Sequence, residues 1–575
     1  MTEQEERPFV CRFVQRLEEF RLPEMASLVR LADSRYRPVY DPEEARLVAT
    51  LVPEEGTPFA RVALEPRPET RAEARAVLGA AAARGVTVKW LVDVWGSGPS
   101  VAAAVAAAAA RADVCAEAAR ARTFCVDVDV FGRRLTRAEQ LALIAETQAL
   151  PVWRHAAVDL RAPELRVAVL LHSSVLAGAR TGTPRDTVYV GAVVAEGMRR
   201  TIERYKLSTR TYLGTTSMNV ELALLMANAG LVRPGTLCYD PFVGTGSIAV
   251  ACAHFGARTL GSDISHSTLH GAQPGRNVRA NFAQYGLAPR LWDLLVLDQS
   301  RSPLRRVPLF HAIVCDPPYG VRAGARRVAP LPDPRNPAKA LARARARGTT
   351  GDATTDASSS ETSEVSPVVG DDKQQQEQQP EQPKQKQHSF AHTELYAVPD
   401  MLRDLLDMAA QTLVLGGRLV FWMPATVEYR ADDVPRHPCL TLVSNSLQQI
   451  TLRWGRRLVT LEKTAEYDPA RHAAALLTPA ELGQSAPSHA DFSSYVFAGS
   501  DAAPEHPRRA RTEDAAAAGV MTDAAVAASG AGLDDRMLAR LEQKRRKKAA
   551  EREKKISSIK RMQEQQQQQQ QGQQQ

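Results

Sequence analysis

Alternating and continuous runs of apolar residues along the chain predict β-strands separated by helices. In the N-terminal third, a helix is expected from Glu18 to about Ala32, and Thr123–Phe131 alternates between apolar and polar positions as a half-buried strand does. Further strands are expected at Phe59–Leu64, Arg166–His172 and Asp186–Val193. Residues 1–195 are therefore expected to form an α+β region, and no catalytic group of residues is recognisable within it.

A second pattern, in which helices separate the early apolar runs, covers residues 196–328 and 390–500. A helix is expected at Asp400–Leu415, ended by Gly416 and Gly417. The expected strands are Thr236–Asp240, Arg258–Asp263, Leu291–Asp298, Ala312–Cys315, Arg418–Pro424, Cys439–Leu447 and Arg457–Lys463. Strands in this arrangement predict a doubly wound α/β sheet with a hairpin at one end.

Two segments lack the composition of a folded core. Residues 329–389 are rich in Ala and Arg and then in Ser, Thr, Gln and Glu, and residues 501–575 contain a basic run followed by a glutamine tail. We expect both segments to be disordered. The first is expected to be an insertion in the loop that follows Tyr319.

The formal net charge of +8 is not spread evenly over the chain. Between Arg536 and Arg561 there are 12 Lys and Arg residues and 3 Glu residues, a local charge of +9, so the rest of the chain sums to −1. Any nucleic-acid surface on the folded part is therefore expected to be local.

Composition and cysteine usage restrict the class of protein. Hydrophobic residues make up 44% of the chain, Met1–Arg7 is too polar for a signal peptide, and the apolar run Ala102–Ala110 is too short to span a bilayer. The seven cysteines form no Cys-x-x-Cys pair. We expect a cytoplasmic protein with no membrane segment, no zinc knuckle and no disulfide framework.

An acidic residue stands at the end of each of the first four strands of the predicted α/β sheet. These residues are Asp240, Asp263, Asp298 and Asp316. Each one alone is typical of a turn or a helix cap. The carboxyl ends of parallel strands are where such sheets bind ligands, so four acids in these places favour a binding site.

The segment after Asp240 contains a glycine turn before a helix, in which Gly244 and Gly246 allow a ligand to approach the backbone. It lacks the lysine of a Walker loop and the third glycine of the dinucleotide fingerprint. An acid at this strand end repels a phosphate and attracts an ammonium or sulfonium group. The pattern therefore predicts an amino-acid-bearing cofactor such as S-adenosylmethionine, with Asp263 accepting the ribose hydroxyls and Asp298 the adenine amine.

The residues after the fourth strand, Asp316-Pro317-Pro318-Tyr319, are suited to hold a flat ring with an exocyclic amine. The carboxylate accepts a hydrogen bond from the amine, the prolines offer carbonyl acceptors without N–H donors, and the tyrosine offers a face for stacking. The same residues are ordinary in a stiff turn. The glycine turn upstream favours the functional interpretation.

Together these motifs resemble the catalytic subunit of the tRNA methyltransferase that makes N2-methylguanosine at position 10. The resemblance rests on Asp240–Gly246 and Asp316–Arg322, and Tyr205–Met218, Asn277–Gly286 and His437–Asn445 support it. It extends from about residue 10 to about residue 500, apart from the insertion.

The resemblance implies a Rossmann-like class I methyltransferase sheet, preceded by a THUMP-containing module that positions tRNA by its acceptor end. It implies S-adenosylmethionine as the cofactor, tRNA as the substrate, and a heterodimer with a small zinc-containing activator subunit. The cofactor-binding residues that it implies are Thr216, Ser217, Asp240, Phe242, Gly244, Gly246, Asp263 and Asp298.

The expected mechanism is direct in-line methyl transfer to the N2 amine of a guanine that is flipped out of the tRNA. Pro318 and Tyr319 would hold the base. Asp316 and Pro317 would each accept one N2 proton, which makes these two residues and Tyr319 the expected catalytic set. Two other functions stay open: methylation of another nucleobase amine, such as ribosomal RNA guanine N2 or adenine N6, and a non-catalytic RNA-binding scaffold.

Overall fold

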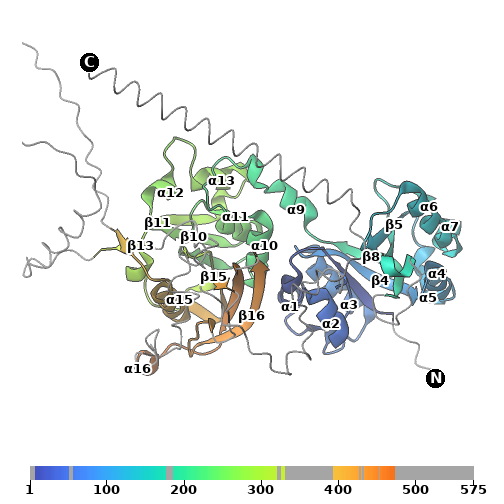
Figure 1. Ribbon diagram of the computed structural model, residues 1–575, viewed down its shortest axis with the longest axis horizontal. Helices are drawn as coiled ribbons and strands as arrows, with labels where there is room; N and C mark the ends of the chain where they lie inside the picture. The colour runs from blue at the N-terminus through green and yellow to red at the C-terminus, as the bar shows by residue number, and fades with distance from the viewer. Residues whose placement is uncertain are drawn as a thin grey trace, which may run out of the picture. The chain divides into compact units, whose positions relative to one another are not determined.

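The computed structural model describes residues 7–50, 56–176, 186–319, 326–329, 393–426, 429, 433–451 and 454–472 (Figure 1). Nearly all of the predicted insertion at 329–389 lies outside the described residues, as do the basic run and the glutamine tail of 501–575. The described residues form two large β-sheets and a small two-stranded one.

The N-terminal residues form an eight-stranded sheet in the order β2-β3-β1-β4-β8-β7-β5-β6. Its strands are β1 (Phe9–Phe13), β2 (Arg37–Val39), β3 (Phe59–Glu65), β4 (Val88–Gly98), β5 (Thr123–Phe131), β6 (Ala157–Val158), β7 (Leu165–His172) and β8 (Val188–Glu196). Its helices are α1 (Arg21–Ala32), α2 (Pro42–Ala49), α3 (Arg71–Ala83), α4 (Val101–Ala109), α5 (Ala112–Ala118), α6 (Arg137–Ala145), α7 (Val152–His155) and α8 (Ser173–Leu176). The predicted strands are confirmed as β3, β5, β7 and β8, and the predicted helix as α1.

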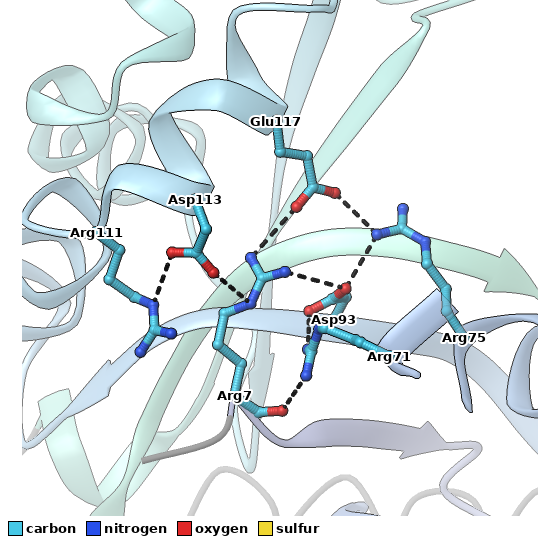
Figure 2. Close-up of polar contacts among 7 residues, drawn as sticks. All are labelled: Arg7, Arg71, Arg75, Asp93, Arg111, Asp113 and Glu117. Atoms are coloured by element: carbon cyan, nitrogen blue, oxygen red, sulfur yellow. Dashed lines mark hydrogen bonds and ion pairs between the residues drawn. The ribbon is translucent and has the colours of Figure 1, made fainter. Parts of the chain in front are cut away.

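A buried ion-pair cluster connects several of these elements (Figure 2). Asp93 on β4 is fully buried and contacts the guanidinium groups of Arg7, Arg71 and Arg75. Arg75 on α3 also reaches Glu117 on α5, with 2.8 Å between Nη1 and Oε1. Burial of a charged carboxylate costs much free energy unless cations and hydrogen bonds replace its lost hydration. The cluster therefore holds α3, α5 and the segment before β1 against the long strand β4.

The second large sheet has seven strands in the order β11-β10-β9-β12-β15-β17-β16, and β17 runs antiparallel to both of its neighbours. Its strands are β9 (Leu237–Asp240), β10 (Arg258–Asp263), β11 (Leu291–Val296), β12 (Phe310–Cys315), β15 (Leu413–Thr426), β16 (Leu440–Gln449) and β17 (Trp454–Lys463). The predicted doubly wound sheet with a terminal hairpin is confirmed. The small sheet pairs β13 (Arg326–Val328) with β14 (Thr393–Leu395), which flank the insertion.

Helices cover both faces of the seven-stranded sheet. They are α9 (Arg199–Arg204), α10 (Val220–Ala229), α11 (Ser247–His254), α12 (His266–His270), α13 (Val278–Gln284), α15 (Val398–Thr412) and α16 (Pro469–His472). Alternation along β15 separates two cores: Trp422 packs with residues of α10 and α11, and Phe421 with residues of α15. Among the residues that the structure describes, no helix combines the length and the apolar composition needed to cross a bilayer.

The predicted helix Asp400–Leu415 is present as α15, which ends earlier, at Thr412. Its predicted end at Gly416–Gly417 is wrong, because both glycines lie inside β15. Leu413 is fully buried and pairs with Phe310 on β12, so sheet pairing replaces the last helical turn. A Cβ at the second glycine would lie 3.0 Å from a carbonyl oxygen of the residue after Phe310, so a close backbone approach explains this glycine.

Buried polar groups connect α1 of the N-terminal region to the seven-stranded sheet and its helices. The Glu24 carboxylate accepts hydrogen bonds from two backbone N–H groups before β4 and, at 2.7 Å, from Nδ2 of Asn228 on α10. Burial raises the pKa of Glu24. Arg30 makes a bidentate ion pair with Glu462 on β17 at 2.7 and 2.9 Å. Removing either carboxylate would leave buried or half-buried donors without an acceptor.

Candidate active site

The carboxyl ends of β9, β10 and β12 carry three carboxylates beside a cavity of about 670 Å³. Asp240 ends β9, Asp263 ends β10 and Asp316 follows β12, and β9 pairs in parallel with both of the other strands. Ten of the predicted site residues line the cavity: Thr216, Ser217, Phe242, Gly244, Asp263, Asp298, Asp316, Pro317, Pro318 and Tyr319. The other two, Asp240 and Gly246, lie next to lining residues in the chain and do not line it themselves.

Asp240 is buried, with 2% of its surface exposed, and has one unsatisfied oxygen. Its Oδ1 accepts the Phe242 N–H at 3.0 Å, whereas its Oδ2 is buried without a hydrogen-bond partner. Burial raises the pKa of Asp240 well above its ordinary range, and the nearby carboxylates of Asp263 and Asp316 raise it further. A positively charged ligand group would offset both effects.

Gly246 has a structural reason to be glycine. It is the N-cap of α11 and has a φ of 82°, in the left-handed region. A Cβ at this position would lie 2.7 Å from Cγ1 of Val278 on α13. Only glycine fits both constraints, and it lets α11 begin directly after the cavity-lining residues Gly244 and Thr245.

Asp263 and Asp298 both reach the cavity, but they differ in what already occupies their oxygens. Asp263 accepts backbone N–H groups from Gly244 at 3.1 Å and Ser265 at 2.8 Å. Burial raises the pKa of Asp263, and these two hydrogen bonds oppose the rise. Asp298 accepts the Ser300 N–H at 2.9 Å and, through Oδ2, a backbone N–H of β13 at 2.6 Å. Each carboxylate therefore keeps a fixed orientation at the cavity wall. A ligand that bonds to either carboxylate would share the carboxylate oxygens with backbone N–H groups.

Ser217 ties the segment before α10 to the glycine turn. Its hydroxyl lies 2.8 Å from the Thr245 hydroxyl and accepts the Gly214 N–H at 3.0 Å. Thr216 lines the cavity next to it. The segment before α10, which sequence analysis singled out only through the family resemblance, thus forms part of the cavity wall.

Arg456 is a cavity residue that the sequence analysis missed. Its Nη1 donates to Oδ2 of Asp316 at 3.4 Å and to the Tyr319 hydroxyl at 3.3 Å. The predicted strand began at Arg457, whereas β17 begins at Trp454. Alternation along a correctly placed strand would have put Arg456 on the same face as Leu458, but no local pattern indicates that this face meets Asp316.

The cavity is therefore lined by the carboxylates of Asp263 and Asp298 and by the acceptor and aromatic groups that follow β12, and the buried Asp240 lies next to a lining residue in the chain. Its volume suits a small-molecule cofactor, whose sites commonly span about 300–1,000 Å³. Within the described part of the chain, no group of three or more His, Cys, Asp or Glu side chains is placed to hold a metal ion.

Comparison with known proteins places this site in a family. Residues 208–329 match the family described as "RMKL-like, methyltransferase domain", and residues 7–199 match "Tmrp11 THUMP N-terminal domain". The chain is 32% identical over 501 residues to the tRNA (guanine(10)-N(2))-methyltransferase of Dictyostelium discoideum, covering 85% of this chain and 88% of that protein. This chain belongs to the tRNA (guanine(10)-N(2))-methyltransferase family. The resemblance drawn from the sequence motifs is confirmed.

Other members of the tRNA (guanine(10)-N(2))-methyltransferase family show the same relationship. The human protein is 34% identical over 358 residues, covering 60% of this chain and 68% of that protein. The Schizosaccharomyces pombe protein is 34% identical over 375 residues, covering 64% of this chain and 67% of that protein. The four acids predicted at strand ends lie within the segment matched as a methyltransferase domain, and Arg456 lies outside it. The predicted strand Leu291–Asp298 is shorter than expected, because β11 ends at Val296 and Asp298 caps the short helical turn that follows.

Replacing Asp240 by Asn tests the electrostatics of this family's site in the ligand-free protein. Because the folded-state pKa is raised, the neutral carboxyl contributes stability that is complete below the ordinary pKa of about 3.9 and is lost as pH rises through the folded-state value. Asp240→Asn removes this loss. We expect its melting temperature, relative to wild type, to increase as the pH is raised from about 4 to about 8.

Asp159→Asn is the control, because backbone N–H groups lower the pKa of the exposed Asp159. Relative to wild type, the melting temperature of this variant should not increase as the pH is raised from about 4 to about 8. A difference between wild type and Asp240→Asn that is constant over the pH range would contradict the account of Asp240.

Proposed function

We propose that this chain transfers the methyl group of S-adenosylmethionine to the exocyclic N2 amine of guanosine 10 in tRNA. The observation that carries the proposal is a single cavity lined both by strand-end acids suited to the cofactor and by Asp316-Pro317-Pro318-Tyr319, suited to an amine on a flat ring. Membership of the tRNA (guanine(10)-N(2))-methyltransferase family supports the choice of base, position and RNA.

The residues on the acidic side fit S-adenosylmethionine. The unpaired Oδ2 of Asp240 and the carboxylates around it favour a ligand with a positive charge, which the ammonium and sulfonium groups of this cofactor provide. Asp263 would accept the ribose hydroxyls and Asp298 the adenine amine, with Thr216, Ser217 and the glycine turn completing the wall. When bound, the cofactor supplies a methyl group on a sulfur that is a good leaving group.

On the base side, the chain would orient a weak nucleophile. The lone pair of the guanine N2 is delocalised into the ring, and the base has to leave its stack to reach the cavity. Tyr319 would stack on the flipped base with Pro318 beside it. The Asp316 carboxylate and the Pro317 carbonyl would each accept a hydrogen bond from one N2–H, which aims the lone pair for in-line attack, and Asp316 would take up the single proton that the methylated amine releases.

The N-terminal region would bring the tRNA to this cavity. It matches a family described as a THUMP N-terminal domain, which supports a role in holding tRNA by its acceptor end. Through α1, that region contacts helix α10 and strand β17 of the seven-stranded sheet.

A small zinc-containing activator subunit would complete the enzyme, and the exposed edge of the seven-stranded sheet is a suitable place for it. Strand β11 ends the sheet and has only β10 as a neighbour among the described strands. Trp292 and Val296 on β11 are 48% and 51% exposed, large values for such apolar side chains. An edge strand with exposed apolar side chains is suited to pairing with a strand of a partner protein.

Nucleoside analysis of tRNA tests the proposed reaction. Unmodified tRNA transcripts are incubated with labelled S-adenosylmethionine and the protein, with and without a co-expressed activator. We expect N2-methylguanosine that is lost when guanosine 10 is replaced. Asp316→Ala should lower turnover by about 10³-fold or more, because the N2 amine loses its acceptor, while cofactor affinity stays within about threefold.

Three results would redirect this proposal. Label on another RNA or on adenine would identify a different nucleobase amine as the substrate. Cofactor binding without transfer, with the activator present, would favour an RNA-binding scaffold. Loss of cofactor binding in Asp316→Ala would give Asp316 a structural role.

Substitutions on β11 test the activator surface. We expect Trp292→Glu with Val296→Lys to prevent co-purification of the activator, while the melting temperature of the isolated chain is retained because both side chains are exposed. Leu442→Glu is the matched control, since Leu442 is 49% exposed on β16, the other edge strand. Undiminished co-purification of the β11 double variant would exclude this edge as the docking site.

A further inference from the structure

Arg456 on β17 is held from several sides beside the proposed base site. Its Nε donates to Oε1 of Gln448 on β16 at 2.8 Å, and its guanidinium carbon lies 4.2 Å from the ring centroid of Trp422 on β15. Nη2 lies 3.7 Å from the Met218 sulfur. The side chain is only 13% exposed. A guanidinium that stacks on an aromatic ring and bonds at its Nε has little freedom to turn.

The remaining nitrogen of this group points at the residues that would hold the base. One atom, Nη1, bridges the Asp316 carboxylate at 3.4 Å and the Tyr319 hydroxyl at 3.3 Å. The bridge spans the two prolines between them, so it connects both ends of the tetrapeptide to a strand on the far side of β15. No other described cation makes a salt bridge with Asp316 within 4.0 Å.

The location of this cation argues for a role beyond packing. Both contacts of its Nη1, to the Asp316 carboxylate and to the Tyr319 hydroxyl, are with residues proposed to hold the base and not with residues proposed to hold the cofactor. The same fixed pairing limits the orientations of the Asp316 carboxylate and the Tyr319 ring.

We propose that Arg456 is a positioning residue for methyl transfer, which holds the Asp316 carboxylate and the Tyr319 ring in the orientation that the target amine requires. This inference rests on the proposed function of the cavity. Arg456 would not contact the transferred methyl group, and its effect would be carried by Asp316 and Tyr319. The expected signature is a loss of turnover without a matching loss of cofactor affinity.

The adjacent residue provides a matched control. Arg457 belongs to the same strand but faces the opposite side, with its guanidinium carbon 3.9 Å from the Tyr429 ring centroid and Nη1 3.4 Å from Oδ1 of Asn445. It has the same charge and a comparable aromatic contact, and it does not line the cavity. Comparing Arg456→Met with Arg457→Met therefore separates the cavity contact from the loss of one arginine on β17.

The experiment measures kcat on tRNA transcripts by nucleoside analysis, cofactor affinity by calorimetry, and melting temperature. We expect Arg456→Met to lower kcat by about 100-fold, the size of effect that a small misplacement of reacting groups produces. Cofactor affinity and melting temperature should change little, and Arg457→Met should keep kcat within about twofold of wild type. Guanidinium ion added to Arg456→Ala should restore part of the lost turnover, which a merely structural role would not predict.

The outcomes separate this inference from the proposed function. If wild type makes no N2-methylguanosine with the activator present, the proposed function fails. If wild type does make it and Arg456→Met retains kcat within about twofold, the positioning role is overturned. Equal losses of turnover in the Arg456→Met and Arg457→Met variants, without rescue by guanidinium, would also overturn it.

Discussion

The burial of carboxylates at one edge of the seven-stranded sheet is the constraint on which the site depends. Parallel pairing of β9 with β10 and β12 brings Asp240, Asp263 and Asp316 to the same edge, and burial raises the pKa of the first two. A buried carboxylate oxygen without a hydrogen-bond partner is rare in folded proteins, so that of Asp240 requires an explanation. Here a cation on the cofactor side and Arg456 on the base side would divide the compensation between them.

The N-terminal region is connected to the strand that carries Arg456. The Phe20 ring, at the start of α1, lies 6.0 Å from the Trp422 ring on which Arg456 stacks. The Ser446 hydroxyl on β16 donates to the Glu19 carbonyl oxygen at 2.9 Å. The region that matches a THUMP domain is thus fixed to the same hairpin that supports the proposed base site.

Local patterns in the sequence were sufficient for the sheet and for most of the site. Each acid from Asp240 to Asp316 ends an apolar run, and the position of a strand end follows from the chain alone. The end of α15 was mispredicted because Leu413 follows the sheet and not the helix, a choice made by its pairing with β12. Arg456 was missed for the same kind of reason, since its partners lie 137 and 140 residues away. Neither the unsatisfied oxygen of Asp240 nor the backbone bonds on Asp298 can be read from composition or spacing.

Calorimetry of S-adenosylmethionine binding tests the central claim most directly. Titrations of wild type and Asp240→Asn between about pH 5 and pH 8, in buffers of different ionisation enthalpy, measure both affinity and the protons exchanged. A cation that binds beside Asp240 favours its ionised form, so wild type should release protons on binding. The variant should release fewer protons and bind at least about tenfold more weakly, because it lacks the negative charge buried beside the cavity. Equal affinity and equal proton exchange in the two proteins would contradict the claim that a cationic ligand stabilises these buried carboxylates in their ionised form.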